Sequence, residues 1–350
     1  MSEKLLDIQN LHTRFRIEGE YYAAVDGVNL TINKNEIFAI VGESGSGKSA
    51  MALSVMRLHN MNFTRIEGNI IFDDKDLLAL PESALNKVRG KDIGMIFQDP
   101  LSFLNPLMRV GEQIEESLFY HTDLDKEGRK ERAIHLLTEV GMSNPALTYS
   151  QLPHELSGGM RQRSMIALAM AAKPSLIIAD EPTTALDVTI QAQILDLMRK
   201  MQEETGVSVI LITHDLGVVA EMADRVAVMY AGQIVEMASV HQIFKNPQHP
   251  YTRSLLNAIP SIATAEKRLH TIQGNVPNLQ NLPRSGCRFA GRIPWILEKD
   301  HEENPTYHEV SPGHSVLCTC YKTFRFENER TELDKFKKKE IEAQVDNKAL

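Results

Sequence analysis

The alternation of apolar and polar residues changes its period along the chain. At residues 5–17 and 25–32 apolar and polar residues alternate, as they do in strands with one exposed face, and Gly19-Glu20 supplies a turn between them. Residues 68–73 and 93–97 indicate further short strands. This part of the chain therefore predicts a small antiparallel sheet at the edge of a larger structure.

From about residue 105 to residue 172 the apolar positions recur with the spacing of helices, as in the amphipathic segments 111–118 and 132–140. Strands return at 176–179 and 207–213, with a helical segment between them, and this alternation predicts a parallel sheet. The expected fold class is α/β, with a mixed central sheet, an antiparallel edge, a helical subdomain at about 105–172 and a small C-terminal extension.

A glycine-rich segment at 42–49 directly follows the apolar run 36–41. The pattern G-x-x-x-x-G-K-[ST] turns successive backbone N–H groups around phosphates and needs a lysine that reaches the outer two. Lys48 is predicted to supply that charge, and the Ser49 hydroxyl is predicted to hold Mg²⁺. The other loop residues expected to bind the phosphates are Gly42, Glu43, Ser44, Gly45, Ser46 and Gly47.

Two carboxylates follow a later apolar strand, at Asp180 and Glu181. Asp180 is the candidate Mg²⁺ ligand. Glu181 is the candidate general base, because a carboxylate beside the γ-phosphate accepts a proton only if the metal does not already saturate it. A helix N-cap is the alternative for such a pair, and the presence of the phosphate loop favours the catalytic interpretation.

A second anion-binding geometry lies inside the helical part. Ser157, Gly158 and Gly159 precede a long apolar helix, so a hydroxyl, two flexible amides and a helix N-terminus could meet a γ-phosphate. In isolation Ser157 would be an ordinary N-cap. Because the chain has two phosphate sites but one acidic pair, the second site is expected to serve the nucleotide of another subunit.

Composition narrows the class of protein. The chain has 350 residues, 43% of them hydrophobic, and this length and composition suit a main domain with an appendage. The net charge of −8 argues against nucleic acid as a partner. No long apolar stretch and no signal-peptide pattern is present, and the cysteines, Cys287, Cys318 and Cys320, all lie near the C-terminal end. These features predict a cytosolic protein.

Taken in order, these motifs resemble the ATP-binding subunit of an ATP-binding-cassette (ABC) transporter over roughly residues 1–320. Residues 42–49 match the family's Walker A motif, 156–162 its signature and 177–181 its Walker B motif. The remaining matches are Gln98 in the Q-loop, Asp187 in the D-loop segment Ala185-Leu186-Asp187, and His214 as the switch histidine.

The resemblance implies that two cassettes meet head to tail and bind ATP with Mg²⁺, so that Ser157 and Gly159 of one complete the site built on Lys48 of the other. It also implies that His214 holds the attacking water in line and that Gln98 senses the γ-phosphate and is a further Mg²⁺ ligand.

An aromatic side chain is expected to stack on adenine. Tyr22 is one candidate, and Tyr21 is equally suited by position. The sequence leaves this choice open.

The segment after residue 245 indicates the subfamily. Residues 246–260 and 286–290 resemble the extension on ATPases of dipeptide, oligopeptide and nickel importers. The alternative is a generic turn followed by a helix, because His-Pro-Tyr breaks any preceding helix and Thr252 can cap the next one, but the fifteen-residue match makes this alternative insufficient. The expected domains are a nucleotide-binding domain at 1–245, the extension at 246–323 and a charged tail at 324–350.

This resemblance implies a subunit that energises uptake of di- and oligopeptides from the cytoplasmic face of the cell membrane. The implied partners are a second ATPase subunit, homologous or identical, two transmembrane permease subunits and an extracytoplasmic substrate-binding protein. A nickel or metal-chelate importer is the closest alternative. A soluble non-transport ATPase is disfavoured for two reasons. The chain has one nucleotide domain rather than a tandem pair, and the separation of Gln98 from Ser157 is too short for long coiled-coil arms.

Many relatives carry four cysteines in the extension that bind a [4Fe–4S] cluster. Here Cys287 and Cys318 match the first and fourth of them, whereas Ile293 stands at the second and Asp300 or His301 near the third. The sequence therefore predicts no standard four-cysteine cluster.

A zinc site is the alternative at this place. It would use His301, His308 or His314 beside the pair Cys318 and Cys320. Free thiols are the simpler expectation.

Overall fold

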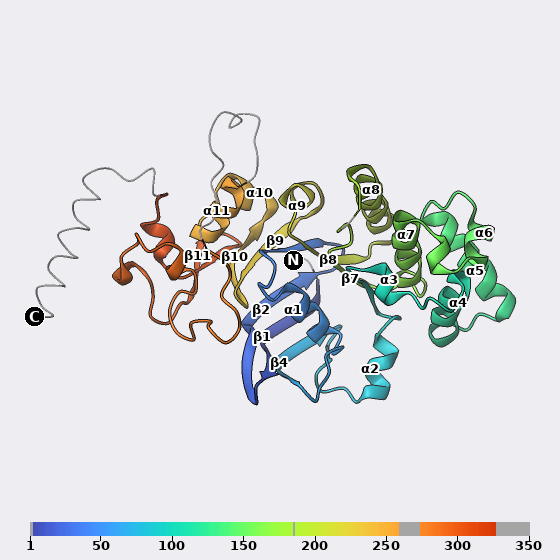
Figure 1. The fold of residues 1–350 in the computed structure, drawn as a ribbon, viewed down its shortest axis with the longest axis horizontal. Helices are drawn as coiled ribbons and strands as arrows, with labels where there is room; N and C mark the ends of the chain where they lie inside the picture. Colours follow the sequence, from blue (N-terminus) through green and yellow to red (C-terminus); the bar gives the residue numbers. More distant parts are fainter. Residues whose placement is uncertain (1–2, 185, 259–273, 327–350) are drawn as a thin grey trace, which may run out of the picture.

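The computed structural model describes residues 3–184, 186–258 and 274–326 and contains two β-sheets (Figure 1). The larger sheet has, in spatial order, β11 (Tyr307–Ser311), β12 (His314–Leu317), β10 (Gln233–Ser239), β9 (Arg225–Tyr230), β3 (Ile37–Val41), β8 (Ser208–Thr213), β7 (Leu176–Asp180) and β6 (Ile93–Ile96). The smaller, antiparallel sheet has β2 (Glu20–Asn33), β1 (Lys4–Ile17), β4 (Thr64–Phe72) and β5 (Lys75–Asp76). The α/β class with an antiparallel edge is confirmed.

The centre of the larger sheet is parallel. Strand β3 pairs in parallel with β8 and β9, β8 with β7, and β7 with β6. Every residue of β3, β7 and β8 is buried, because parallel strands in such a sheet are covered on both faces. The carboxyl ends of these strands therefore meet at one edge, where loops place polar side chains.

Helices cover the sheet and form a separate lobe beside it. Around the sheet lie α1 (Lys48–Val55), α2 (Glu82–Val88), α8 (Val188–Thr205) and α9 (Leu216–Met222). The lobe, on the right in Figure 1, contains α3 (Pro100–Phe103), α4 (Val110–His121), α5 (Lys126–Glu139), α6 (Pro145–Ser150) and α7 (Gly158–Ala169). It is the helical insert that the sequence predicts.

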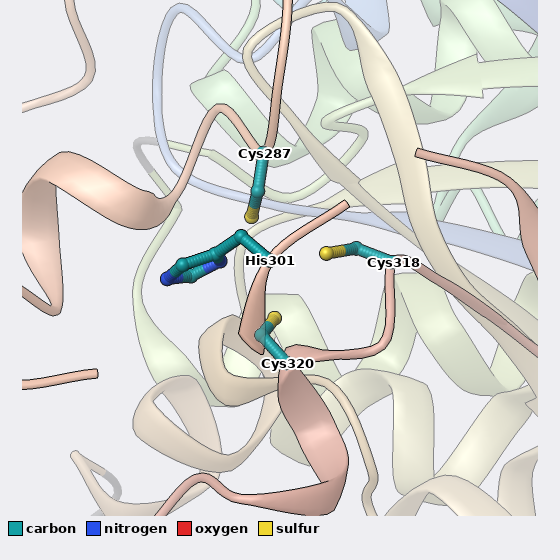
Figure 2. A group of neighbouring side chains, drawn as sticks. All are labelled: Cys287, His301, Cys318 and Cys320. Carbon is teal, nitrogen blue, oxygen red and sulfur yellow. The ribbon is translucent and has the colours of Figure 1, made fainter. Parts of the chain in front are cut away.

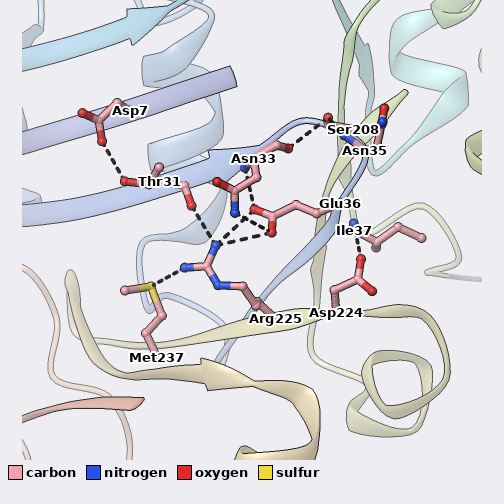
Figure 3. A network of polar contacts seen from close by, with 10 residues as sticks. All are labelled: Asp7, Thr31, Asn33, Asn35, Glu36, Ile37, Ser208, Asp224, Arg225 and Met237. Atoms are coloured by element: carbon pink, nitrogen blue, oxygen red, sulfur yellow. Dashed lines mark hydrogen bonds and ion pairs between the residues drawn. The ribbon is translucent and has the colours of Figure 1, made fainter. Parts of the chain in front are cut away.

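A polar network fixes the start of β3 between the two sheets (Figure 3). The buried Glu36 carboxylate accepts from Arg225 on β9 at 3.2 Å and from the amide of Asn33 at the end of β2 at 2.7 Å. The amide of Ile37 donates to Asp224 at 2.8 Å. These bonds tie both sheets to the strand that carries the glycine-rich loop.

The C-terminal extension continues the larger sheet. Strand β12 pairs antiparallel with β10, and β11 with β12. Tyr230 of the sheet belongs to one buried cluster with Tyr251, Phe289 and Phe324 of the extension. The proposed division at residue 245 remains a prediction, and both the sheet and this cluster cross it. Of the charged tail, residues 327–350 lie outside the described residues.

Two short helices flank the predicted start of the extension, α10 (Val240–Lys245) before it and α11 (Pro250–Asn257) after it. Thr252, the cap in the alternative interpretation of this segment, does not cap the second of them. The cap is His249, whose Nδ1 accepts from the amide of Tyr251 at 3.1 Å, and Thr252 lies buried inside the first turns. The helix begins earlier because Pro250 is suited to the first helical position.

The capping histidine predicts a pH dependence of stability. Burial lowers the pKa of His249 from 6.5 to about 4. The unfolded chain therefore binds this proton at a higher pH than the folded chain does, so its stabilising effect is lost as the pH falls from 6.5 toward 4. Acidification from pH 7 to pH 5 should cost about 2 kcal/mol through this residue.

The check is the free energy of unfolding at both pH values for the wild type and His249→Asn, since asparagine also caps helices but does not titrate. The pH-dependent loss should shrink by that amount in the variant. His241→Asn, at an exposed histidine of α10, is the matched control. Equal losses in all three proteins would contradict the assignment to His249.

Candidate functional site

The glycine-rich loop connects β3 to α1 through close backbone contacts. A Cβ atom at Gly42 would lie 2.1 Å from the carbonyl oxygen of Met229, and one at Gly47 would lie 2.5 Å from that of Ala24. Gly47 also has a φ of +107°, which favours glycine. The loop can therefore curl only with glycine at these positions, and α1 starts directly after it.

Lys48 is the first residue of α1, and its side chain folds back onto the loop. Its Nζ donates to the carbonyl oxygens of Gly42 at 2.8 Å and Glu43 at 3.0 Å. Burial lowers the pKa of Lys48, and the nearby carboxylates of Glu181 and Asp180 oppose that effect. The ammonium group is thus held by neutral carbonyls in a position from which it can pass to phosphate oxygens.

A buried hydroxyl also suits a phosphate. Ser46 Oγ is buried and has no hydrogen-bond partner within the described residues. A polar atom in that state is unfavourable unless a ligand binds it. The chemistry of this loop therefore fits a phosphorylated ligand.

The two side chains predicted to hold Mg²⁺ touch each other. Ser49 Oγ donates to Asp180 Oδ1 at 3.0 Å, across 131 residues of sequence. Burial raises the pKa of Asp180, and the hydrogen bond from Ser49 opposes this. A hydroxyl and a carboxylate at this spacing are the oxygen ligands that Mg²⁺ takes in nucleotide sites.

Glu181 is the meeting point of three side chains. Its Oε2 accepts from Gln98 Nε2 at 3.0 Å and from Thr184 Oγ1 at 2.8 Å, and its Oε1 lies 3.3 Å from His214 Nδ1. Its backbone has a φ of +49°, an uncommon conformation for a residue with a side chain. The structure thus brings together Gln98, Glu181 and His214. Thr184 was missed by the sequence analysis, although a hydroxyl three residues after a carboxylate could have indicated it.

The Ser-Gly-Gly segment lies apart from these residues. Ser157 is exposed at the start of α7, where its Oγ accepts from the amide of Met160 at 3.3 Å. No hydrogen bond between described residues joins Ser157, Gly158 or Gly159 to the phosphate loop. Within one chain this serine is a helix cap and Gly158 is exposed, whereas Gly159 faces α8, where a Cβ would lie 2.8 Å from the side chain of Ile190.

Asp187 is also a cap, at the start of α8. Its Oδ1 accepts from the amide of Ile190 at 3.0 Å. Of the D-loop match, Ala185 lies outside the described residues.

Both candidate tyrosines line one pocket. This pocket, of about 340 Å³, contains Tyr21, Tyr22, Asp26 and Arg284 among its lining residues. The guanidinium of Arg65 lies 3.9 Å from the centre of the Tyr21 ring, and that of Arg284 lies 5.4 Å from the centre of the Tyr22 ring. Each ring thus has a cation over it, and the choice between them stays open.

Two residues of the extension contact the phosphate loop, and the sequence analysis missed both. Arg292 binds the Glu43 carboxylate with two hydrogen bonds, of 2.6 Å and 3.2 Å. The amide of Glu43 donates to the hydroxyl of Tyr251 at 2.8 Å. No local pattern predicts these contacts, because more than two hundred residues separate the partners. The extension therefore positions the loop from outside the cassette.

The contacts of Arg292 and Tyr251 with Glu43 form a clamp on the phosphate loop, and removing its arginine should weaken nucleotide binding. We expect Arg292→Gln to raise the KM for ATP roughly three- to tenfold with little change in kcat, because a bidentate, charge-assisted contact orders the loop but touches no reacting atom. Steady-state ATPase measurements test this. Arg253→Gln, which removes a contact to the carbonyl oxygen of Phe324, is the matched control. An unchanged KM in Arg292→Gln would contradict the clamp.

Three features define the class of protein as a P-loop nucleoside-triphosphate hydrolase. They are the phosphate loop, the contact between Ser49 and Asp180, and the Glu181 carboxylate with its three side-chain partners. The family model "ABC transporter" matches residues 25–184, and the model "Oligopeptide/dipeptide transporter, C-terminal region" matches residues 235–298. The solved dimeric, post-hydrolysis structure of the ATP-binding cassette MJ0796 bound to ADP and Pi superposes with a TM-score of 0.61 at 30% identity, over 67% of this chain and 99% of that one.

Curated relatives match over nearly the whole chain. The oligopeptide transport ATP-binding protein OppD of Lactococcus lactis subsp. cremoris (strain SK11) is 48% identical over 94% of this chain and 98% of its own length. The protein of the same name from Bacillus subtilis (strain 168) is 51% identical over 89% of this chain and 88% of its own. The chain therefore belongs to the ABC transporter family of ATP-binding subunits and carries the C-terminal region of its oligopeptide/dipeptide group.

Among the described residues, no helix combines the length and the apolar character needed to cross a bilayer.

Proposed function

We propose that this chain binds and hydrolyses ATP to energise the uptake of di- and oligopeptides. The observation that carries the ATPase part is the convergence of Gln98, Thr184 and His214 on the Glu181 carboxylate, beside the phosphate loop. The peptide part rests on the relatives that are named as oligopeptide transport proteins and on the matching C-terminal region.

The proposed mechanism assigns one task to each polar group. Lys48 and the amides of the loop hold the β- and γ-phosphates and neutralise charge that develops on the γ-phosphoryl group. Glu181 accepts a proton from the attacking water. His214, 3.3 Å from that carboxylate, holds the water and the phosphoryl group in line. The bond broken joins the γ-phosphorus to the bridging oxygen, and ADP and phosphate leave.

The cation that accompanies ATP in this family, Mg²⁺, would neutralise phosphate charge. Its proposed protein ligands are Ser49 and Asp180, which already share a hydrogen bond, together with the side-chain oxygen of Gln98. Because the side-chain amide of Gln98 donates to Glu181, Gln98 can couple binding of Mg²⁺ and ATP to the position of the general base Glu181.

A second ATPase subunit, identical or homologous, is proposed to complete the site. In it Ser157, Gly158 and Gly159 would face the γ-phosphate bound by Lys48, and Asp187 would lie at the junction. The exposure of Ser157 at a helix N-terminus supports this, since such an end attracts anions and has no phosphate partner in its own chain. One of Tyr21 and Tyr22 is proposed to stack on adenine.

The remaining proposed partners are two transmembrane permease subunits and an extracytoplasmic substrate-binding protein. Together they would hold this chain at the cytoplasmic face of the membrane. No nucleic acid is proposed as a partner, in keeping with the net charge of −8.

The test is the ATPase activity of the complete complex reconstituted in lipid with its binding protein. Binding protein loaded with di- or oligopeptides should stimulate hydrolysis several-fold over the unloaded protein. Stimulation by nickel chelate alone would replace the peptide proposal with a metal importer. ATP hydrolysis by the isolated chain without response to any loaded binding protein would favour a non-transport ATPase.

A further inference from the structure

Four metal-ligating side chains of the extension have no part in the function proposed above. Cys287, His301 and the pair Cys318 and Cys320 come from three segments, and one ligand atom from each of the four residues lies within 4.8 Å of the others. Figure 2 shows the three sulfur atoms directed toward one another, with the His301 ring beside them. The fold thus gathers residues from an interval of more than thirty positions around one point.

The state of these side chains points to a ligand. All three cysteines are buried and free of disulfide bonds. The Nδ1 atom of His301 is buried and has no hydrogen-bond partner in the described part of the chain. A buried nitrogen left in that state is unfavourable, so a bound ion would remove a penalty as well as form bonds. Cys318 has a φ of +70°, a strained backbone conformation of the kind found at ligand sites.

The group that many relatives bind here does not fit. A [4Fe–4S] cluster takes four cysteine thiolates, one at each iron, which places their sulfurs roughly 6 Å apart. This chain supplies three sulfurs and an imidazole, and all ligand atoms lie within 4.8 Å. Ile293, which stands where relatives have their second cysteine, is buried in the adjoining hydrophobic cluster. Both the ligand set and the spacing disagree with a cluster.

A single tetrahedral ion does fit. With metal–sulfur bonds of about 2.3 Å, the ligand atoms of a zinc site lie about 3.8 Å apart, so inward movements of an ångström or less would close the shell. Three cysteines and one histidine are a ligand set of closed, structural zinc sites. We propose that Cys287, His301, Cys318 and Cys320 bind one Zn²⁺ ion.

The other histidines near this place have different partners. His314 Nε2 lies 2.7 Å from Glu236 Oε1 within the sheet, and both side chains are fully buried. His308 Nε2 lies 2.5 Å from Glu302 Oε1. His301 is the histidine that joins the cysteines. A pocket of about 620 Å³, lined in part by Cys287 and His301, gives the ion a path of entry.

The zinc site would fix the segment that contacts the phosphate loop. Directly after Cys287, Arg288 pairs with Asp26 and donates to the carbonyl oxygen of Ala231 at 2.5 Å. Five residues after Cys287, Arg292 binds Glu43. The ion therefore anchors one end of the clamp on the nucleotide site. It binds no substrate and takes no part in the reaction.

The test is metal analysis of the full chain, purified without oxygen from cells grown with both iron and zinc. We expect one zinc ion per chain, and after exchange the absorption of a tetrahedral cobalt–thiolate centre. His301→Ala should lower zinc affinity by at least about tenfold, because it removes one of four ligands. His308→Ala, at a histidine of the same extension that faces Glu302, is the matched control and should retain zinc.

A competing chelator applied to the wild-type chain gives a readout that does not depend on any variant folding. Removing zinc should raise the KM for ATP as Arg292→Gln does. About four irons with acid-labile sulfide per chain would overturn the proposal in favour of a cluster. A chain that holds no zinc, and whose three thiols all react with an alkylating reagent under native conditions, would overturn it in favour of free cysteines.

Discussion

Replacement of Glu181 by glutamine is expected to lower steady-state ATP hydrolysis by a factor of about 10² to 10⁴ while ATP still binds. Glutamine keeps the shape of the side chain and can still meet Gln98 and Thr184, but it cannot accept a proton from water. Because the phosphate loop is unchanged, the variant should accumulate in an ATP-bound form, with two cassettes closed on the nucleotide.

Two measurements separate the effect of Glu181→Gln on hydrolysis from its effect on ATP binding. Phosphate release should fall, whereas binding of a fluorescent ATP analogue should stay within about threefold of the wild type. Size-exclusion chromatography with ATP should show the trapped pair of cassettes. Glu203→Gln, the same change at an exposed position of α8, should leave turnover unaltered. Unchanged turnover in Glu181→Gln would remove Glu181 from the role of base.

Replacement of Lys48 by methionine should impair ATP binding, the step before hydrolysis. Methionine fills similar space, but it removes the ammonium group that now bonds to Gly42 and Glu43 and is proposed to bind phosphate oxygens. Charge-assisted hydrogen bonds contribute about 1.5–3 kcal/mol each, so the loss of two should weaken ATP binding about a hundredfold or more. Hydrolysis should fall in parallel at ordinary ATP concentrations.

Titration with the same fluorescent analogue measures this loss. Lys200→Met, at a solvent-exposed lysine of α8, controls for the loss of a charge. A Lys48→Met variant that binds ATP as tightly as the wild type would show that the loop does not use this lysine for the phosphates. The contrast between the two variants, one that binds without turnover and one that does not bind, is itself a test of the assigned roles.

The parts of the site that the sequence predicted are those encoded locally. The step from β3 through Gly42 and Gly47 to α1 needs a fixed order of residue types within a few positions, because the backbone passes Met229 and Ala24 too closely for any side chain. The strand that ends at Asp180 could also be predicted, because its apolar residues and the two carboxylates occupy adjacent positions. In each case the sequence pattern and the structural cause cover the same short stretch of chain.

The parts that the sequence could not predict depend on contacts between distant segments. The clamp from Arg292 and Tyr251 onto Glu43 exists only once the extension has packed against Tyr230. The sequence likewise left His301, His308 and His314 as equal candidates beside the cysteines. Contacts in the folded chain separate them: the pairing of β12 with β10 commits His314 to Glu236, His308 contacts Glu302, and His301 lies beside the cysteines.

The most direct test of the central claim is accumulation of a labelled peptide by the complete complex in vesicles that enclose ATP on the side of this chain. The wild type should concentrate the peptide together with ATP hydrolysis, and the complex with Glu181→Gln should bind ATP without uptake. Peptide uptake that proceeds equally with Glu181→Gln, or ATP hydrolysis by the wild type that moves no peptide, would contradict the central claim.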